Sequence, residues 1–169
     1  MTTSTELKQD DITPEKQITT YLQRLDKDPA DLEALQWLSF LYCREGMYQK
    51  SLEYCLKALN YYPAEATLHN NISNIYKKIG LADKAYAHLH EAIRLEPNYA
   101  EAFNNLGTLF YLQKRFEKAR PYFEKAIRIY PRYFEAHYNL ANTLYQTEQV
   151  DSAVTHYQQA LSLKPDHPG

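Results

Sequence analysis

Glycine is scarce in this sequence, which has only four among its 169 residues and is rich in Ala, Leu, Glu, Lys, Gln and Tyr. This balance favours helices over a turn-dense sandwich or barrel. No apolar run is long enough to span a bilayer, and the first residues, MTTSTELKQDDITPEK, lack the apolar core of a signal peptide. We therefore expect a soluble, cytoplasmic protein with no membrane insertion.

Excess charge and the common chemical motifs are lacking as well. The formal net charge of -2 gives no electrostatic reason to bind nucleic acid. The two cysteines, Cys43 and Cys55, do not have the spacing of a metal knuckle or a redox pair, so we expect free thiols. Phosphate loops, nucleophile elbows and zinc-protease motifs do not occur. We therefore predict no enzyme activity, no metal and no cofactor.

Proline supplies the strongest pattern that is present, because five of the eight prolines recur every 34 residues, at Pro29, Pro63, Pro97, Pro131 and Pro165. A small column and an apolar column follow the same spacing: Ala58, Ala92, Ala126 and Ala160, and Leu38, Ile72, Leu106 and Leu140. An internal repeat of this length is typical of a helical solenoid.

Each period contains two apolar stripes with helical spacing, separated by a break. Gly46 and Gly80 mark the break in the first two full periods, where a left-handed residue ends a helix. Lys114 and Glu148 hold that place later, at a cost of up to about 1 kcal/mol each if they keep the same conformation. We predict full repeats at 32–65, 66–99, 100–133 and 134–167. A capping helix or degenerate repeat at 14–31 precedes them, a polar tail covers 1–13, and 168–169 end the chain.

The pattern resembles the tetratricopeptide-repeat family over residues 14–167. Its signature is best kept by Phe103, Leu106, Gly107, Phe110, Ala119, Phe123, Ala126 and Pro131. The resemblance implies an all-α, right-handed superhelical solenoid of antiparallel helix pairs. In that family the first helices line a concave groove that binds peptides or a partner helix. His69 and His137 replace the first aromatic of the signature, and we expect partly buried imidazoles there rather than metal ligands.

The face opposite the core stripe of each first helix is the predicted groove. On it, Asn71, Asn105 and Asn139 form a ladder whose carboxamides match the donor and acceptor of a peptide unit. The alternative that these asparagines only solvate the groove stays open. The predicted groove residues are Gln36, Trp37, Phe40, Arg44, Asn70, Asn71, Asn74, Lys78, Asn104, Asn105, Thr108, Tyr111, Tyr138, Asn139, Asn142 and Tyr145.

We therefore expect an adaptor or scaffold that binds a protein or peptide. A clamp for an acidic chain end is not expected, because the matching places hold no cation. The segment EAFNNLG is also similar to the repeats of O-linked N-acetylglucosamine transferases. An alternative is therefore an N-terminal substrate-recruiting arm of a larger glycosyltransferase or methyltransferase. A weaker alternative is a self-associating structural protein, a homo-oligomer through an uncapped C-terminal face at Tyr157 and Leu161.

Overall fold

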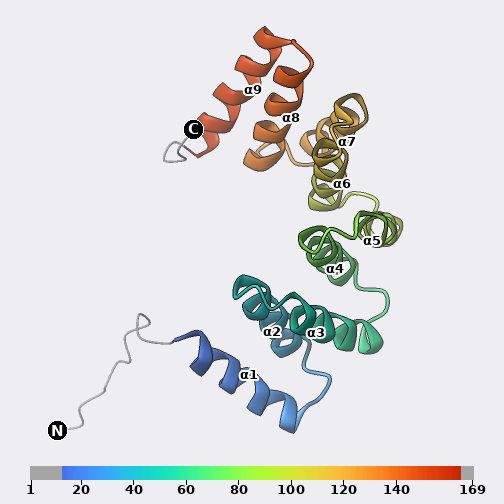
Figure 1. Ribbon diagram of the computed structural model, residues 1–169, viewed down its shortest axis with the longest axis vertical. Coiled ribbons are helices and arrows are strands. Elements are labelled where there is room, and N and C mark those ends of the chain that lie inside the picture. Colours follow the sequence, from blue (N-terminus) through green and yellow to red (C-terminus); the bar gives the residue numbers. More distant parts are fainter. Residues whose placement is uncertain (1–12, 165–169) are drawn as a thin grey trace, which may run out of the picture. The chain divides into compact units, whose positions relative to one another are not determined.

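The computed structural model describes residues 13–164, and every regular element in that range is an α-helix (Figure 1). The nine helices are α1 (Pro14–Lys27), α2 (Leu32–Arg44), α3 (Tyr48–Tyr61), α4 (Ala66–Lys78), α5 (Ala82–Leu95), α6 (Ala100–Leu112), α7 (Phe116–Ile129), α8 (Phe134–Gln146) and α9 (Val150–Leu163). The all-α fold of antiparallel helix pairs is confirmed. The predicted tail, except Thr13, and residues 165–169 lie outside the described residues.

The turn inside each helix pair contains one left-handed residue. Gly46 and Gly80 have φ of 73° and 78°, and Lys114 and Glu148 have φ of 58° and 61°. The left-handed conformation predicted for Gly46 and Gly80 is thereby confirmed, and Lys114 and Glu148 keep the same conformation. Lys114 and Glu148 carry the steric cost that a Cβ brings to this region, and the glycines avoid it.

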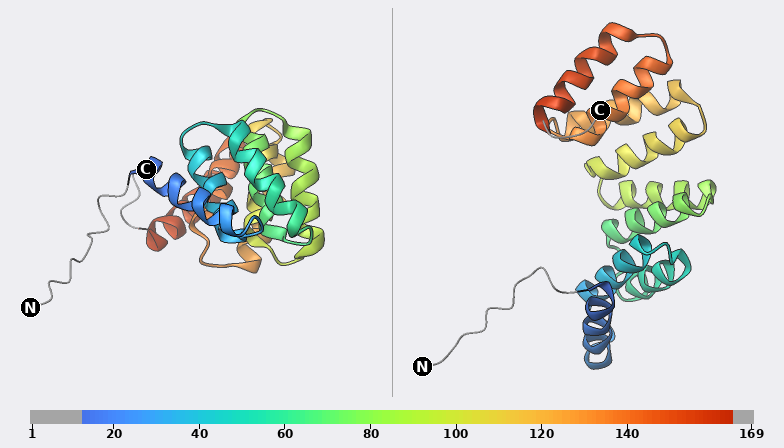
Figure 2. Two further views of the ribbon diagram at one scale, coloured as in Figure 1. Left: turned by 90° about the horizontal axis from the view of Figure 1, so that it is seen from below. Right: turned by 60° about the vertical axis from the view of Figure 1, so that its left-hand side comes forward.

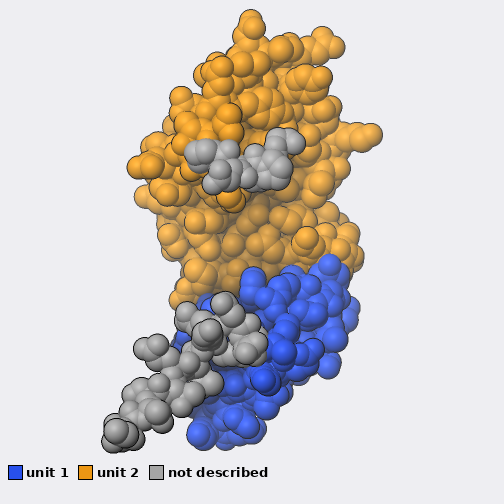
Figure 3. Space-filling model, turned by 90° about the vertical axis from the view of Figure 1, so that its left-hand side faces the viewer, with its two compact units in different colours: residues 1–63 blue, residues 64–169 orange. Residues whose placement is uncertain are grey.

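The chain divides into two compact units, residues 1–63 and 64–169 (Figure 3). In the first unit, α1 and α3 each pack against α2. In the second unit, the pairs α4–α5, α6–α7 and α8–α9 are stacked one on another (Figure 2). Its first helices are neighbours, since α4 contacts α6 and α6 contacts α8. The single repeat array over 14–167 stays a prediction.

Close packing joins the two helices of the pair α6–α7. Phe123 of α7 is completely buried, and its ring lies over Gly107 of α6. A Cβ atom placed on Gly107 would stand 2.7–2.9 Å from three atoms of that ring, which real Cβ atoms do not tolerate. Gly107 is therefore needed for close approach, and its small size determines how near α7 lies to α6.

Candidate functional site

Asparagine side chains link the neighbouring first helices of the second unit. The Asn105 Nδ2 of α6 donates to the Asn70 Oδ1 of α4 at 2.8 Å, and the Asn139 Nδ2 of α8 donates to the Asn104 Oδ1 of α6 at 3.0 Å. Each bond joins the second asparagine place of one repeat to the first of the repeat before it. We call these two bonds the asparagine rungs. They hold the carboxamides of adjacent repeats in a fixed orientation.

The first asparagine of each rung is an interior residue. Asn70 and Asn104 are each only 6% exposed. Burial raises the pKa of Tyr99 to about 12, and its contact with the Asn70 side chain acts in the opposite direction. Burial likewise raises the pKa of Tyr133, which contacts the Asn104 side chain. Both tyrosines therefore stay neutral, and Asn70 and Asn104 are satisfied inside the protein.

The second asparagine of each rung lies closer to the solvent. Asn105 and Asn139 are half-buried, and each uses one N–H in its rung. Within residues 13–164 no further partner is found for the second N–H of either side chain, or for the Asn139 oxygen. Asn71, the equivalent residue of α4, is exposed. These carboxamides keep hydrogen-bonding capacity for a ligand.

The remaining predicted groove residues of the second unit differ in how much the fold already uses them. The Thr108 hydroxyl donates to the Asn104 carbonyl at 2.9 Å, and the Asn142 oxygen accepts from the Tyr157 hydroxyl at 2.6 Å. Asn74, Tyr111 and Tyr138 are half-buried, Lys78 is exposed, and the Tyr145 side chain is 59% exposed. Tyr145 is therefore the most accessible aromatic group on this face.

Lys77 was not among the groove residues predicted from the sequence, which included its neighbour Lys78 instead. It precedes Tyr111 by 34 positions and Tyr145 by 68, so it holds the same place in its helix, whereas Lys78 corresponds to Leu112. The Lys77 Nζ donates to the Asn105 Oδ1 at 3.2 Å. Burial, and to a smaller extent the charge of Lys78, lowers the pKa of Lys77 to about 8. Aligning the helices by the 34-residue period would have placed Lys77, rather than Lys78, with Tyr111 and Tyr145.

The predicted groove residues of the first unit include an aromatic stack. Tyr21 of α1 is stacked on Trp37 of α2 with ring centroids 6.0 Å apart, and Trp37 meets Phe40 edge-on at 5.5 Å. Trp37 is 42% exposed and Phe40 is 53% exposed. Gln36 is half-buried, and Arg44 is exposed next to Glu45. The first unit therefore presents its own apolar surface patch.

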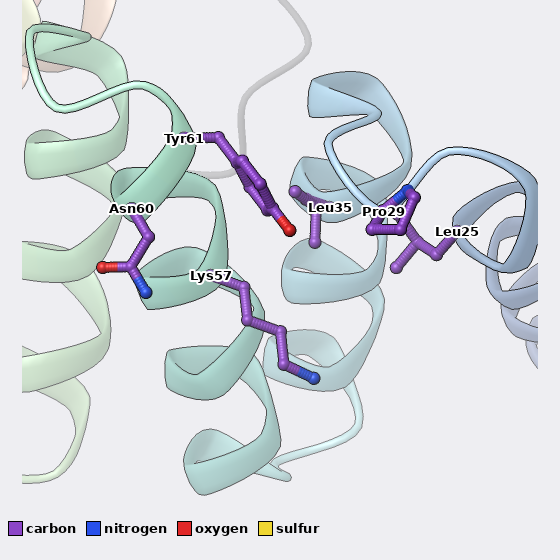
Figure 4. A pocket seen from close by; sticks show the side chains of 6 residues that line it. All are labelled: Leu25, Pro29, Leu35, Lys57, Asn60 and Tyr61. Atoms are coloured by element: carbon purple, nitrogen blue, oxygen red, sulfur yellow. The ribbon is translucent and has the colours of Figure 1, made fainter.

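A hollow of roughly 460 Å³ also lies in the first unit, between the end of α1, the start of α2 and the last turns of α3 (Figure 4). It is lined by Leu25, Pro29, Leu35, Lys57, Asn60 and Tyr61. The Lys57 ammonium pairs with Glu53 at 2.8 Å on its own helix. The lining is mostly aliphatic and aromatic, and it contains no pair of groups suited to acid–base or nucleophilic chemistry.

Two histidine pairs join the helices of α4–α5 and α8–α9. The Nδ1 atoms of His69 and His88 are 3.0 Å apart, as are those of His137 and His156. His69 is 8% exposed and His137 is 6% exposed, which confirms the predicted burial.

The ring centroids of these pairs are 5.2 and 5.3 Å apart. This centroid distance is close to the sum of the 3.0 Å between the two Nδ1 atoms and the radii of the two rings. Each Nδ1 therefore points straight at the Nδ1 of the other ring. Nitrogens that share a metal point at a third position instead. Each pair is joined by a hydrogen bond in which the Nδ1–H of one ring donates to the Nδ1 of the other. The part of the chain that the structure describes also contains no group of three or more metal-binding side chains.

The second unit is thus a stack of helix pairs whose first helices share a polar, partly exposed face, which is the architecture of a helical-repeat protein. Two tetratricopeptide-repeat family models match residues 64–132 and 110–169, and the chain belongs to the tetratricopeptide-repeat family. No curated protein sequence matches the chain. None of the helices described is long and apolar enough to cross a membrane.

Several solved structures have a similar fold. TTC0263, a thermophilic TPR protein in Thermus thermophilus, has a TM-score of 0.79 and 22% identity, over 90% of this chain and 84% of that one. MamA from Desulfovibrio magneticus RS-1 has a TM-score of 0.73 and 19% identity, over 92% and 88%. YrrB, a TPR protein with an unusual peptide-binding site, has a TM-score of 0.65 and 22% identity, over 91% and 79%.

Proposed function

We propose that the second unit is a protein-interaction module that binds an extended peptide across α4, α6 and α8. The observation that carries this proposal is the pair of asparagine rungs, which orient Asn105 and Asn139 and leave part of each carboxamide without a partner among residues 13–164. A carboxamide has a donor and an acceptor, as a peptide unit does. The likeness in fold to YrrB, a protein with a peptide-binding site, supports the proposal.

The rungs provide preorganisation. Side chains already held by hydrogen bonds lose little conformational freedom when a ligand arrives, so more of the contact energy appears as affinity. Packed helices are about 10 Å apart and an extended chain advances about 3.3 Å per residue. Neighbouring asparagines therefore meet about every third residue of the peptide. These contacts recognise backbone rather than sequence.

Tyrosines supply the apolar part of the proposed site. Tyr145 is mostly exposed, and Tyr111 is half-buried with its ring 5.2 Å from that of Phe116. Tyrosine gives a large contact area at a low cost in side-chain entropy, and it is common among residues that dominate binding. Tyr111 and Tyr145 would receive apolar side chains of a peptide held by the asparagines.

Peptide selection with a matched pair of variants tests the proposal. Peptides selected from a random library on the full chain are measured by fluorescence anisotropy, where micromolar affinity corresponds to about -8 kcal/mol. Tyr145→Ala should weaken binding about tenfold or more. Tyr86→Ala removes a tyrosine that is 41% exposed on the second helix α5, and it should change little. Equal effects of the two variants, or no selectable peptide, would count against the proposal.

A second candidate function, self-association, has an observation of its own on α9. Val150, Val154 and Leu161 are 50%, 46% and 54% exposed there. Phe116 and Ile127, at the places of Val150 and Leu161 in α7, are half-buried. Concentration-dependent mass in sedimentation equilibrium, abolished by Leu161→Glu, would support a homo-oligomer through α9. A monomer at all concentrations would reject it.

A further inference from the structure

Lys77 stands out among the residues at its place in the repeats. The equivalent residues of α6 and α8 are Tyr111 and Tyr145, so α4 alone puts a cation at this place in the second unit. Its ammonium lies 3.2 Å from the oxygen of Asn105, and that carboxamide is itself held by its rung to Asn70. The charge is therefore positioned beside a carboxamide of the proposed groove.

In the part of the chain that the structure describes, the charge on Lys77 has no acidic counterpart. Across residues 13–164, none of the ion pairs involves Lys77. A buried ammonium without a carboxylate is unfavourable, and burial accordingly lowers the pKa of Lys77 to about 8. The group is still largely protonated at neutral pH. A feature that costs stability in the free protein is typical of a functional site.

Lys78 is the natural comparison for Lys77, because it is the other cation at the same end of α4. It lies in the same last turn of α4, where either lysine interacts favourably with the helix dipole. Lys78 is exposed, whereas Lys77 is half-buried with its ammonium against Asn105. The helix dipole therefore accounts for Lys78 but does not require the buried position of Lys77.

The opposite charge lies at the other end of these helices. Glu101 and Glu135 are exposed in the first turns of α6 and α8. The negative charge of Glu101 helps to raise the pKa of both Tyr99 and Tyr133. A negative group on a ligand is disfavoured near these carboxylates and favoured near Lys77, so the charges favour its placement at the Lys77 end of the helices.

From these placements we infer that the peptide bound by the second unit carries an aspartate or glutamate side chain that pairs with Lys77. This inference rests on the proposed peptide site. The carboxylate belongs to a side chain rather than to a chain end, because Asn71 and Asn139 extend the proposed backbone contacts to both sides of the Lys77–Asn105 pair. A carboxylate there removes the cost of the isolated charge and adds a charge-assisted hydrogen bond.

Capped peptides that differ at one position test this inference. A selected peptide is made with an acetylated N-terminus, an amidated C-terminus, and Glu, Gln or Lys at the position that faces Lys77. Affinities are measured at pH 7 for the full-length wild-type chain, Lys77→Met and Lys78→Met. We expect the Glu peptide to bind the wild type about tenfold more tightly than the Gln peptide. The ratio should fall to about one in Lys77→Met and persist in Lys78→Met.

The outcomes separate this inference from the proposed function. If the wild type binds the Glu and Gln peptides equally, or if Lys77→Met keeps the ratio, the acidic preference is wrong while the peptide site stands. If the wild type binds no peptide, both fail. A measurement on the wild type alone guards against a misfolded variant: NMR titration of the Lys77 ammonium should show its pKa rising with the Glu peptide and unchanged with the Gln peptide.

Discussion

The helix pairs α4–α5 and α6–α7 have the same helix lengths and the same turn position, yet different contacts join their two helices. In α6–α7 the contact is apolar, with Phe123 lying on Gly107. In α4–α5 the equivalent Leu89 is also buried, and a hydrogen bond between His69 and His88 is added to that packing; α8–α9 repeats the bond with His137 and His156. The repeat therefore sets where the helices meet, while local side chains decide whether the stability of that junction also depends on protonation.

The largest expected effect concerns the apolar junction. Gly107→Val places a branched side chain where even a Cβ is too close to Phe123, and we expect a loss of about 3 kcal/mol in the free energy of unfolding. Urea denaturation measures it. Ser73→Ala, the equivalent place in α4, should cost less than about 1 kcal/mol. Phe123→Leu should recover part of the loss in a double-mutant cycle. Additive losses would mean that the two residues do not conflict.

The next effect concerns the residues at the place of Lys77. Lys77→Met should raise the free energy of unfolding by up to about 3 kcal/mol at pH 7, because an isolated buried charge is removed. Since the pKa of Lys77 is about 8 in the folded chain and near 10.5 when unfolded, the cost is full below pH 8 and is relieved as the pH rises to about 10.5. Denaturation at pH 7 and pH 10 measures both parts. An equal gain at both values would show that charge is not the cause.

The histidine junctions predict a dependence on pH that the apolar junction lacks. Burial lowers the pKa of His88 and His156, and the facing His69 and His137 lower it further. As the pH falls, the unfolded chain therefore binds protons at these histidines at a higher pH than the folded chain does. The contribution of these histidine pairs to the free energy of unfolding is complete above the ordinary pKa of 6.5. It is lost as the pH falls through the lowered pKa values of the folded chain, by about 1 kcal/mol per hydrogen bond.

Thermal unfolding between pH 7.5 and pH 5 measures this loss. The double variant His88→Gln, His156→Gln should have a flatter profile, and His90→Gln, an exposed histidine of α5, is the matched control. If the double variant keeps the acid sensitivity of the wild type, the pairs are not its source.

The smallest effect concerns the turns. Lys114→Gly at the end of α6 should stabilise the chain by about 0.5–1 kcal/mol, because glycine removes the steric cost at φ of 58°. Gly80→Ala at the end of α4 should lose about 1 kcal/mol through the backbone alone, since no atom lies within 4 Å of the added Cβ. Matching denaturant midpoints for the two variants would contradict this account of the turns.

Most of the fold follows from the sequence because the repeat is visible in it. Pro63, Pro97 and Pro131 follow the ends of α3, α5 and α7, as expected. Gly46 and Gly80 predicted the left-handed places that Lys114 and Glu148 also adopt. The burial of His69 and His137 followed from their place in a core column. The partners of these histidines were not predicted, although His88 and His156 are 68 residues apart, as His69 and His137 are.

Less of the candidate site was accessible from the sequence. Two adjacent asparagines differ by about 100° around a helix, so a small rotation decides which of Asn104 and Asn105 is interior. Sequence cannot show that rotation. Nor can it show that the carboxamides bond to one another between repeats, because those bonds join side chains 35 residues apart whose geometry depends on helix packing.

Side-chain amide NMR tests the central claim, a peptide site across α4, α6 and α8, most directly. The wild-type chain, labelled with ¹⁵N, is titrated with a selected peptide while the carboxamide signals are followed. We predict that Asn71, Asn105 and Asn139 shift and that Asn60 and Asn98, which lie on α3 and in the α5–α6 turn, do not. Saturable binding that leaves Asn105 and Asn139 unmoved would contradict the claim and place the ligand on another surface.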